Sequence, residues 1–174
     1  VAAALFGGLV ISGERTVEER SIGGDTRYFA VKSEVHADLV SVVFVPQLEV
    51  ETKLARGLLP AEVSHRAASE NASRVALLIA AAATAPDLLH TATRDFLHQD
   101  YRAPAMPETL ALVGRLRGRG VAAVVSGAGP SVLVLSRSSE ARALLAEAPD
   151  GWASHIVAID RSMQTPWATR RSAV

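Results

Sequence analysis

Two short valine-rich runs separated by a loop of small residues constrain the fold of this chain more than any other feature. The runs are residues 121–125 and 132–135, and the loop at residues 126–131 reads Ser-Gly-Ala-Gly-Pro-Ser. Valine-rich runs bounded by glycine and proline predict two strands, each buried on at least one face. Gly127 and Gly129 can adopt positive φ and let another group approach the backbone closely. The loop is therefore either a plain tight connection or a backbone concavity that can hold an anion.

Strands and helices alternate along the chain from residue 39 in a β-α-β-β-α-β order, with extra helices in the first crossover. Strands are expected at residues 39–45, 121–125, 132–135 and 156–159. Helices are expected at residues 52–59, at residues 65–84, from Pro107 onward, and after Ser138 or Ser139. This order is typical of a ferredoxin-like split βαβ domain of the α+β class. Right-handed crossovers would place its helices on one face of an antiparallel sheet.

Two segments of the first crossover carry more specific expectations. In the alanine-rich helix at residues 65–84, apolar residues recur at steps of three and four and predict the buried face. These residues are Ala68, Ala72, Val75, Ile79 and Ala83. The segment at residues 98–107 is polar and interrupted by proline, so no regular element is expected there.

Composition excludes several classes of function. The formal net charge is +0, which gives no general attraction to nucleic acid or to an anionic membrane. The most lipid-like stretch, residues 75–83, is far shorter than the ~20 residues that a membrane span needs. The absence of cysteine excludes disulfides and thiolate–metal sites and fits a cytoplasmic location. No pair of the five histidines has the close helical spacing of a metal site, so no metal site is expected within this chain.

Four stretches together resemble the C-terminal half of homoserine kinases, members of the GHMP family of small-molecule kinases. They are Ala-Leu-Phe-Gly-Gly-Leu from Ala4, Thr-Lys-Leu-Ala-Arg-Gly-Leu-Leu-Pro from Thr52, His-Gln-Asp-Tyr-Arg-Ala-Pro-Ala-Met-Pro from His98, and Val-Ser-Gly-Ala-Gly-Pro-Ser-Val from Val125. The last stretch resembles a motif shared by all GHMP kinases. The second and third stretches are similar to homoserine kinases in particular, so the resemblance extends to the kind of substrate.

The resemblance implies a kinase that uses ATP and Mg²⁺ to phosphorylate the hydroxyl of L-homoserine, a step toward threonine. It also implies that residues 1–36 are the end of a truncated N-terminal domain, residues 37–162 a ferredoxin-like C-terminal domain, and residues 163–174 a tail. The Gly/Ser-rich phosphate loop of the family lies in the N-terminal half, and no such loop occurs in this sequence. The chain alone is therefore expected to be inactive.

The resemblance also assigns roles to individual residues. Homoserine is a small zwitterion whose carboxylate requires a fixed cation, and the planar guanidinium fork of arginine can bind a carboxylate bidentately. Arg56 and Arg102 match the arginines that hold the amino-acid substrate, and they are expected to converge beside the glycine loop. Thr52 either caps its helix or bonds near the reacting hydroxyl, where it would be catalytic. The loop would contact ATP phosphates or form the floor of the site through Ser126, Gly127, Gly129 and Ser131.

Three matters stay open at the level of sequence. Another GHMP kinase with a different small alcohol substrate would share the glycine loop. A non-catalytic amino-acid-binding module would share the ferredoxin-like fold, since fold alone does not determine function. A homodimer is compatible with the sequence, which does not decide the oligomeric state.

Overall fold

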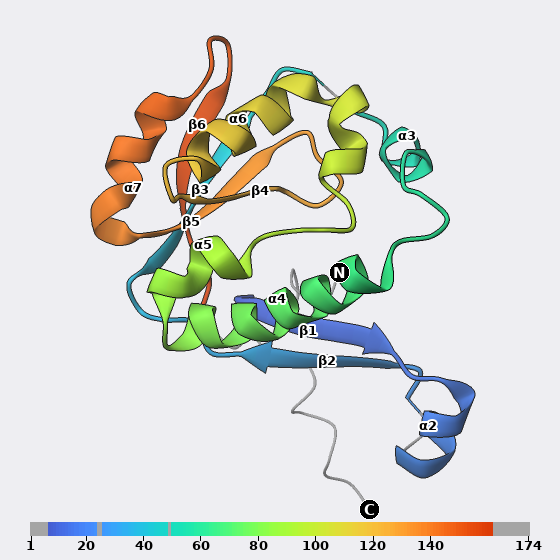
Figure 1. Cartoon of the computed structure of the whole chain (residues 1–174). Coiled ribbons are helices and arrows are strands. Elements are labelled where there is room, and N and C mark those ends of the chain that lie inside the picture. Colours follow the sequence, from blue (N-terminus) through green and yellow to red (C-terminus); the bar gives the residue numbers. More distant parts are fainter. Residues whose placement is uncertain (1–6, 24–25, 49, 162–174) are drawn as a thin grey trace, which may run out of the picture. The chain divides into compact units, whose positions relative to one another are not determined.

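The computed structural model describes residues 7–23, 26–48 and 50–161 (Figure 1). These residues divide into two compact units. The larger is His36–Ala158, and the smaller consists of the described residues of Val1–Val35 and Ile159–Val174. That residues 1–36 are the remnant of an N-terminal domain stays a prediction, and the expected tail at residues 163–174 lies outside the described residues.

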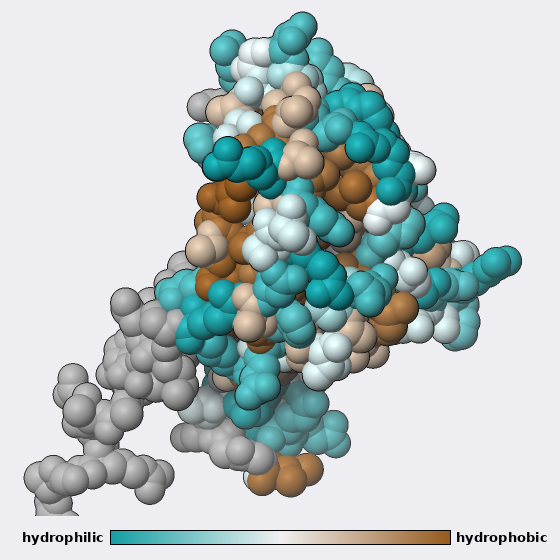
Figure 2. Space-filling model, turned by 90° about the vertical axis from the view of Figure 1, so that its left-hand side faces the viewer, coloured by the Kyte–Doolittle hydropathy of each residue, from teal (hydrophilic) through white to brown (hydrophobic). Residues whose placement is uncertain are grey.

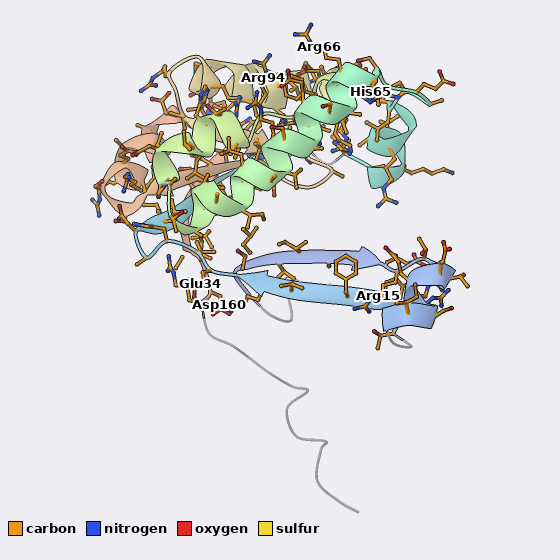
Figure 3. The ribbon with its side chains drawn as sticks, turned by 60° about the horizontal axis from the view of Figure 1, so that its bottom comes forward. Arg15, Glu34, His65, Arg66, Arg94 and Asp160 are labelled. Carbon is orange, nitrogen blue, oxygen red and sulfur yellow. The ribbon has the colours of Figure 1, made fainter. Side chains whose placement is uncertain are left out.

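The smaller unit is built on a β-hairpin. Strands β1 (Leu9–Glu14) and β2 (Tyr28–Ser33) pair antiparallel, and helix α2 (Val17–Gly23) lies in the connection between them. Arg15, labelled in Figure 3, follows β1 and donates a hydrogen bond of 2.7 Å to the Thr26 hydroxyl. This bond ties the two ends of the connection together.

The larger unit contains a four-stranded antiparallel sheet. Its strands are β3 (Leu39–Val45), β4 (Ala122–Val125), β5 (Val132–Arg137) and β6 (Ala153–Ala158), in the spatial order β4-β5-β3-β6. Strands β3 and β5 are central, β4 and β6 lie at the edges, and each strand is antiparallel to its neighbours. This is the split βαβ topology. The predicted fold class is confirmed, although β6 begins three residues earlier than residues 156–159 would place it.

Helices fill both crossovers of this sheet. The first crossover holds α3 (Thr52–Gly57), α4 (His65–Ala83), η1 (Pro86–Leu88), α5 (Leu89–Ala92), η2 (Asp100–Ala105) and α6 (Pro107–Arg117), and the second holds α7 (Ser138–Leu144) and η3 (Leu145–Glu147). The hydroxyl of Ser64 accepts a hydrogen bond from the Ala67 amide at the start of α4, as an N-cap serine does. Pro107 is the first residue of α6, where its missing N–H costs nothing, as predicted.

One face of the sheet is packed against these helices. The strand register sets Val42 opposite Val134 and Phe44 opposite Val132, and all four side chains are fully buried. They form one core cluster with residues of α6 and α7, namely Leu112, Val113, Leu116, Ala141 and Leu144. Figure 1 shows α6 and α7 beside the strands, with α7 at the left. The prediction that helices cover one face is therefore confirmed.

The opposite face of the sheet is less covered. Val45 of this face is 38% exposed and Val43 and Leu133 are half-buried, whereas the residues that alternate with them are buried, namely Val42, Phe44, Val132 and Val134. Hydrophobic patches interrupt the otherwise hydrophilic surface in the view of Figure 2. Within residues 7–23, 26–48 and 50–161, no helix combines the length and the apolar character that crossing a bilayer would require.

The structure corrects two expectations for the first crossover. In α4, Ala68, Ala72 and Val75 are exposed, Ile79 and Ala83 are half-buried, and the buried residues are Ala81 and Ala82. Alanine occurs on every side of this helix, so spacing could not show which side α5 would pack against. The segment at residues 98–107 contains the 3₁₀ helix η2, with Pro104 inside it. Pro104 has no backbone N–H, so it removes one hydrogen-bond donor from this short helix.

Candidate active site

Arg102 is the most constrained arginine of the predicted site. It lies in η2, is only 8% exposed, and donates a hydrogen bond of 2.9 Å from Nη1 to the carbonyl oxygen of Gly127. Its Nε is buried and has no hydrogen-bond partner. Among the described residues, no carboxylate lies within ion-pair distance of this guanidinium. A buried cation without a counter-ion is costly, so the site is suited to an anionic ligand.

Two side chains ahead of η2 fix the segment that carries Arg102. The side-chain oxygen of Gln99 accepts a 2.6 Å hydrogen bond from the amide of Val125 in β4. The carboxylate of Asp95 accepts hydrogen bonds from the amides of Leu97, His98 and Gln99. Burial alone would raise the pKa of Asp95, but the amide hydrogen bonds outweigh it and the pKa is lowered. Asp95 is thus an ionised structural anchor.

The glycine loop adopts the conformation that its sequence predicts. Gly127 has φ +60° and Gly129 has φ +90°, and a Cβ on Gly129 would lie 2.5 Å from the sulfur of Met106. The amide of Ser126 donates to the carbonyl of Ser131 at 2.8 Å, and the amide of Gly129 donates to the carbonyl of Ser126 at 3.0 Å. The loop's own turn therefore uses two of its amides.

The amides that remain limit what the loop could bind. Pro130 has no amide hydrogen, and its peptide bond with Gly129 is cis. An anion could then reach at most the amides of Gly127, Ala128 and Ser131. The hydroxyl of Thr109 in α6 donates a 2.7 Å hydrogen bond to the carbonyl of Pro130 in the loop. The loop is held from one side by α6 and from another by Arg102.

A pocket of about 340 Å³ opens where these groups meet. It is lined by Thr93, Asp95, His98, Gln99, Arg102, Val124, Val125 and Gly127. The structure thus brings Arg102 and the loop residue Gly127 into one pocket, although they are 25 positions apart in the chain. His98 bonds Asp95 through Nδ1 at 3.1 Å, as a structural hydrogen bond would require.

The other predicted site residues are placed less fully. Arg56 lies on α3, which packs against η2, but its side chain is exposed and is not among those lining the pocket. That Arg56 and Arg102 converge stays a prediction. Glu51 occupies the N-cap position of α3, so the expected cap at Thr52 is wrong and Thr52 is the first helical residue. The side chain of Thr52 lies outside the described residues.

Sequence reasoning missed the supporting residues of the pocket. Gln99 bonds the backbone of β4, Thr109 bonds the backbone of the glycine loop, and Asp95 bonds the backbone amide of Gln99. The partners of Gln99 and Thr109 are main-chain groups more than 20 positions away, so no spacing rule could reveal them. For Asp95 a local signal existed, because aspartate side chains often accept a hydrogen bond from the amide two residues later in an Asx turn.

Comparison with known proteins shows which family the region around the pocket is similar to. Residues 76–154 match the family model described as GHMP kinases C terminal. This region is thus similar to the C-terminal domain of GHMP kinases. It includes η2, the glycine loop and the pocket between them.

Individual relatives extend the similarity beyond this domain. The homoserine kinase of Streptomyces avermitilis is 48% identical over 160 residues, which cover 92% of this chain and 50% of that protein. The homoserine kinase of Streptomyces coelicolor is 46% identical over 171 residues, which cover 97% of this chain and 52% of that protein. The chain thus spans about half the length of these curated relatives, and it is similar to their C-terminal half.

A solved structure supports the fold. The crystal structure of homoserine kinase from Cytophaga hutchinsonii superposes with a TM-score of 0.77 at 24% sequence identity, covering 91% of this chain and 50% of that one. At this identity the likeness establishes the architecture and not the substrate. It agrees with the topology read from the strand pairings.

Proposed function

We propose that this chain forms the amino-acid-binding part of an ATP-dependent homoserine kinase. The reaction transfers the γ-phosphoryl group of ATP to the hydroxyl of L-homoserine and releases ADP and O-phospho-L-homoserine, as a step of threonine biosynthesis. The observation that carries this proposal is Arg102, a buried guanidinium with no carboxylate partner among the described residues, which faces a pocket shared with the glycine loop. The similarity to homoserine kinases supports the same assignment.

In this proposal Arg102 binds the carboxylate of the substrate. Its Nη1 is oriented by the carbonyl of Gly127, which leaves its other donors for a ligand. Arg56, from the neighbouring α3, supplies a second guanidinium, and Thr52 at the start of α3 bonds near the reacting hydroxyl. Phosphoryl transfer depends mainly on alignment and on stabilisation of charge, so orienting the substrate is the main task of these residues.

The glycine loop supports the site beside Arg102. Ser126, Gly127, Gly129 and Ser131 either form its floor or offer up to three amides, from Gly127, Ala128 and Ser131, to a phosphate oxygen. The described residues contain no group of three or more acidic or histidine side chains that could hold a metal ion, so they do not by themselves fit Mg²⁺. No step of the mechanism is therefore assigned to a metal held by this chain.

Steady-state kinetics of the complete enzyme that contains this chain test the proposal. In Arg102→Ala, the KM for homoserine should rise about 10- to 150-fold, as expected from losing hydrogen bonds between charged groups. The KM for ATP should stay within about twofold of the parent value, because the lost contact is to the amino acid. An unchanged KM for homoserine would disprove the role of Arg102.

A substrate panel tests the choice of homoserine. The complete enzyme should prefer L-homoserine over mevalonate and over sugars, since only the amino acid offers a carboxylate close to the reacting hydroxyl together with an ammonium group. A preference for one of the other alcohols would point to a different GHMP kinase activity. Binding of an amino acid without phosphoryl transfer would instead support a regulatory module.

A further inference from the structure

Three arginines meet at a second pocket of the larger unit. This pocket of about 360 Å³ is lined by Arg74, His90, Thr91, Arg94, Arg117 and Gly118. It shares no lining residue with the pocket of Arg102. The three arginines come from α4, from the segment after α5 and from the end of α6, so the fold gathers them from separate elements.

Arg117 is the fixed member of this group. Its Nη1 donates to the hydroxyl of Thr93 at 3.0 Å and to the carbonyl of Ala123 at 3.1 Å, and its Nη2 donates to the carbonyl of His90 at 2.6 Å. The pKa of Arg117 is lowered, first by burial and second by the positive charge of Arg94. Arg117 is thus held in place beside a like charge, which is an unfavourable arrangement without an anion.

The other two arginines have donors to spare. Arg74 makes a 3.2 Å ion pair with Glu70 one turn earlier on α4, but its Nε is buried and has no hydrogen-bond partner. Arg94, labelled in Figure 3, is exposed, and its guanidinium lies 5.0 Å from the centre of the Phe96 ring. A ring satisfies none of the five guanidinium donors, so Arg94 remains able to bind an acceptor.

The charges around the pocket do not balance. Among the described residues, only Arg74 of the three has an ion-pair partner, Glu70, so the three guanidinium groups and this carboxylate carry a net charge of +2. His90, whose Nε2 lies 3.1 Å from the carbonyl oxygen of Arg117, carries no negative charge that could offset this excess. Asp95, the acidic neighbour of Arg94 in sequence, lines the other pocket and is bound by amides there.

We propose that the pocket formed by Arg74, Arg94 and Arg117 is a binding site for a phosphate group, either inorganic phosphate or the phosphoryl group of a small metabolite. A phosphate dianion matches the excess charge of the pocket. Its oxygens point in several directions, which suits donors that arrive from three separate elements, whereas a carboxylate offers two oxygens in one plane. The inference does not depend on the function proposed for the Arg102 pocket.

A titration followed by nuclear magnetic resonance tests this site directly. Inorganic phosphate is added to the isotopically labelled protein at low ionic strength and slightly alkaline pH, and the Nε–H signal of Arg74 and the amide signals of Thr91 and Gly118 are followed. These signals should shift together and saturate. A parallel titration with O-phospho-L-serine identifies the source of the phosphate: tighter binding favours a phosphorylated metabolite, and equal or weaker binding favours inorganic phosphate.

Two variants make the titration decisive. Arg94→Gln removes an exposed charge whose loss leaves the core intact, and it should weaken phosphate binding at least about tenfold. Arg142→Gln removes an exposed arginine of α7 that does not line the pocket, and it should change the affinity less than about twofold. Equal effects of the two variants, equal binding of acetate, or no shift of the pocket signals would each overturn the proposal.

Discussion

Replacing Gly129 by alanine should destabilise the larger unit more than the same change at Gly127. Both glycines have positive φ, which costs an L-residue about 1–2 kcal/mol. At Gly129 the new Cβ would also lie 2.5 Å from the sulfur and 2.8 Å from the terminal carbon of Met106, and 3.1 Å from Val125. At Gly127 nothing lies within 4 Å of the new atom.

The structure sets the magnitudes of the two effects. Met106 is 1% exposed and cannot move into solvent without opening the core. Forcing an extra methyl group into a packed core typically costs about 1–3 kcal/mol. Gly129→Ala should therefore cost about 2–5 kcal/mol of unfolding free energy, and Gly127→Ala about 1–2 kcal/mol.

Urea denaturation followed by far-ultraviolet circular dichroism measures both losses, and an unchanged m-value shows that the unfolded states are comparable. A third variant isolates the steric part. A Met106→Val background removes the sulfur and the terminal carbon of this side chain. In that background Gly129→Ala should cost about as much unfolding free energy as Gly127→Ala, so the effects of Met106→Val and Gly129→Ala should not be additive. Equal costs of the two alanine substitutions in the parent protein would refute the packing argument.

Two further predictions concern the supports of the Arg102 pocket. Thr109→Val keeps the shape of a side chain that is 2% exposed but leaves the carbonyl of Pro130 without its donor, so it should cost about 1–3 kcal/mol in the same urea assay. The control Thr109→Ser keeps the hydroxyl and should therefore avoid the hydrogen-bond part of that loss. Because the folded pKa of Asp95 is lowered, its stabilisation is present above the ordinary value of 3.8 and is lost as pH falls through the folded value. The stability difference between the parent and Asp95→Asn should therefore shrink below about pH 4, and a difference that stays constant down to acid unfolding would contradict this role.

The elements of the larger unit were largely determined by local sequence. Residues 39–45 form β3 as predicted, Pro107 begins α6, and the glycines of the loop have the predicted positive φ. These features depend on the backbone preferences of the residues themselves and on strand periodicity, which act over a few neighbouring positions. The β-α-β-β-α-β order then restricts the sheet to few topologies, and the split βαβ arrangement is the one observed.

Which groups meet was decided only by the tertiary structure. Ala68, Ala72 and Val75 form a regular stripe in the sequence but are exposed, whereas Ala81 and Ala82 of the same helix are buried. Arg102 gains its partner Gly127, and Arg74 comes to the same pocket as Arg117, through contacts between residues far apart in the chain. Periodicity fixes which face of an element is apolar, but it does not encode which element will cover that face, and the burial of each guanidinium follows from that packing.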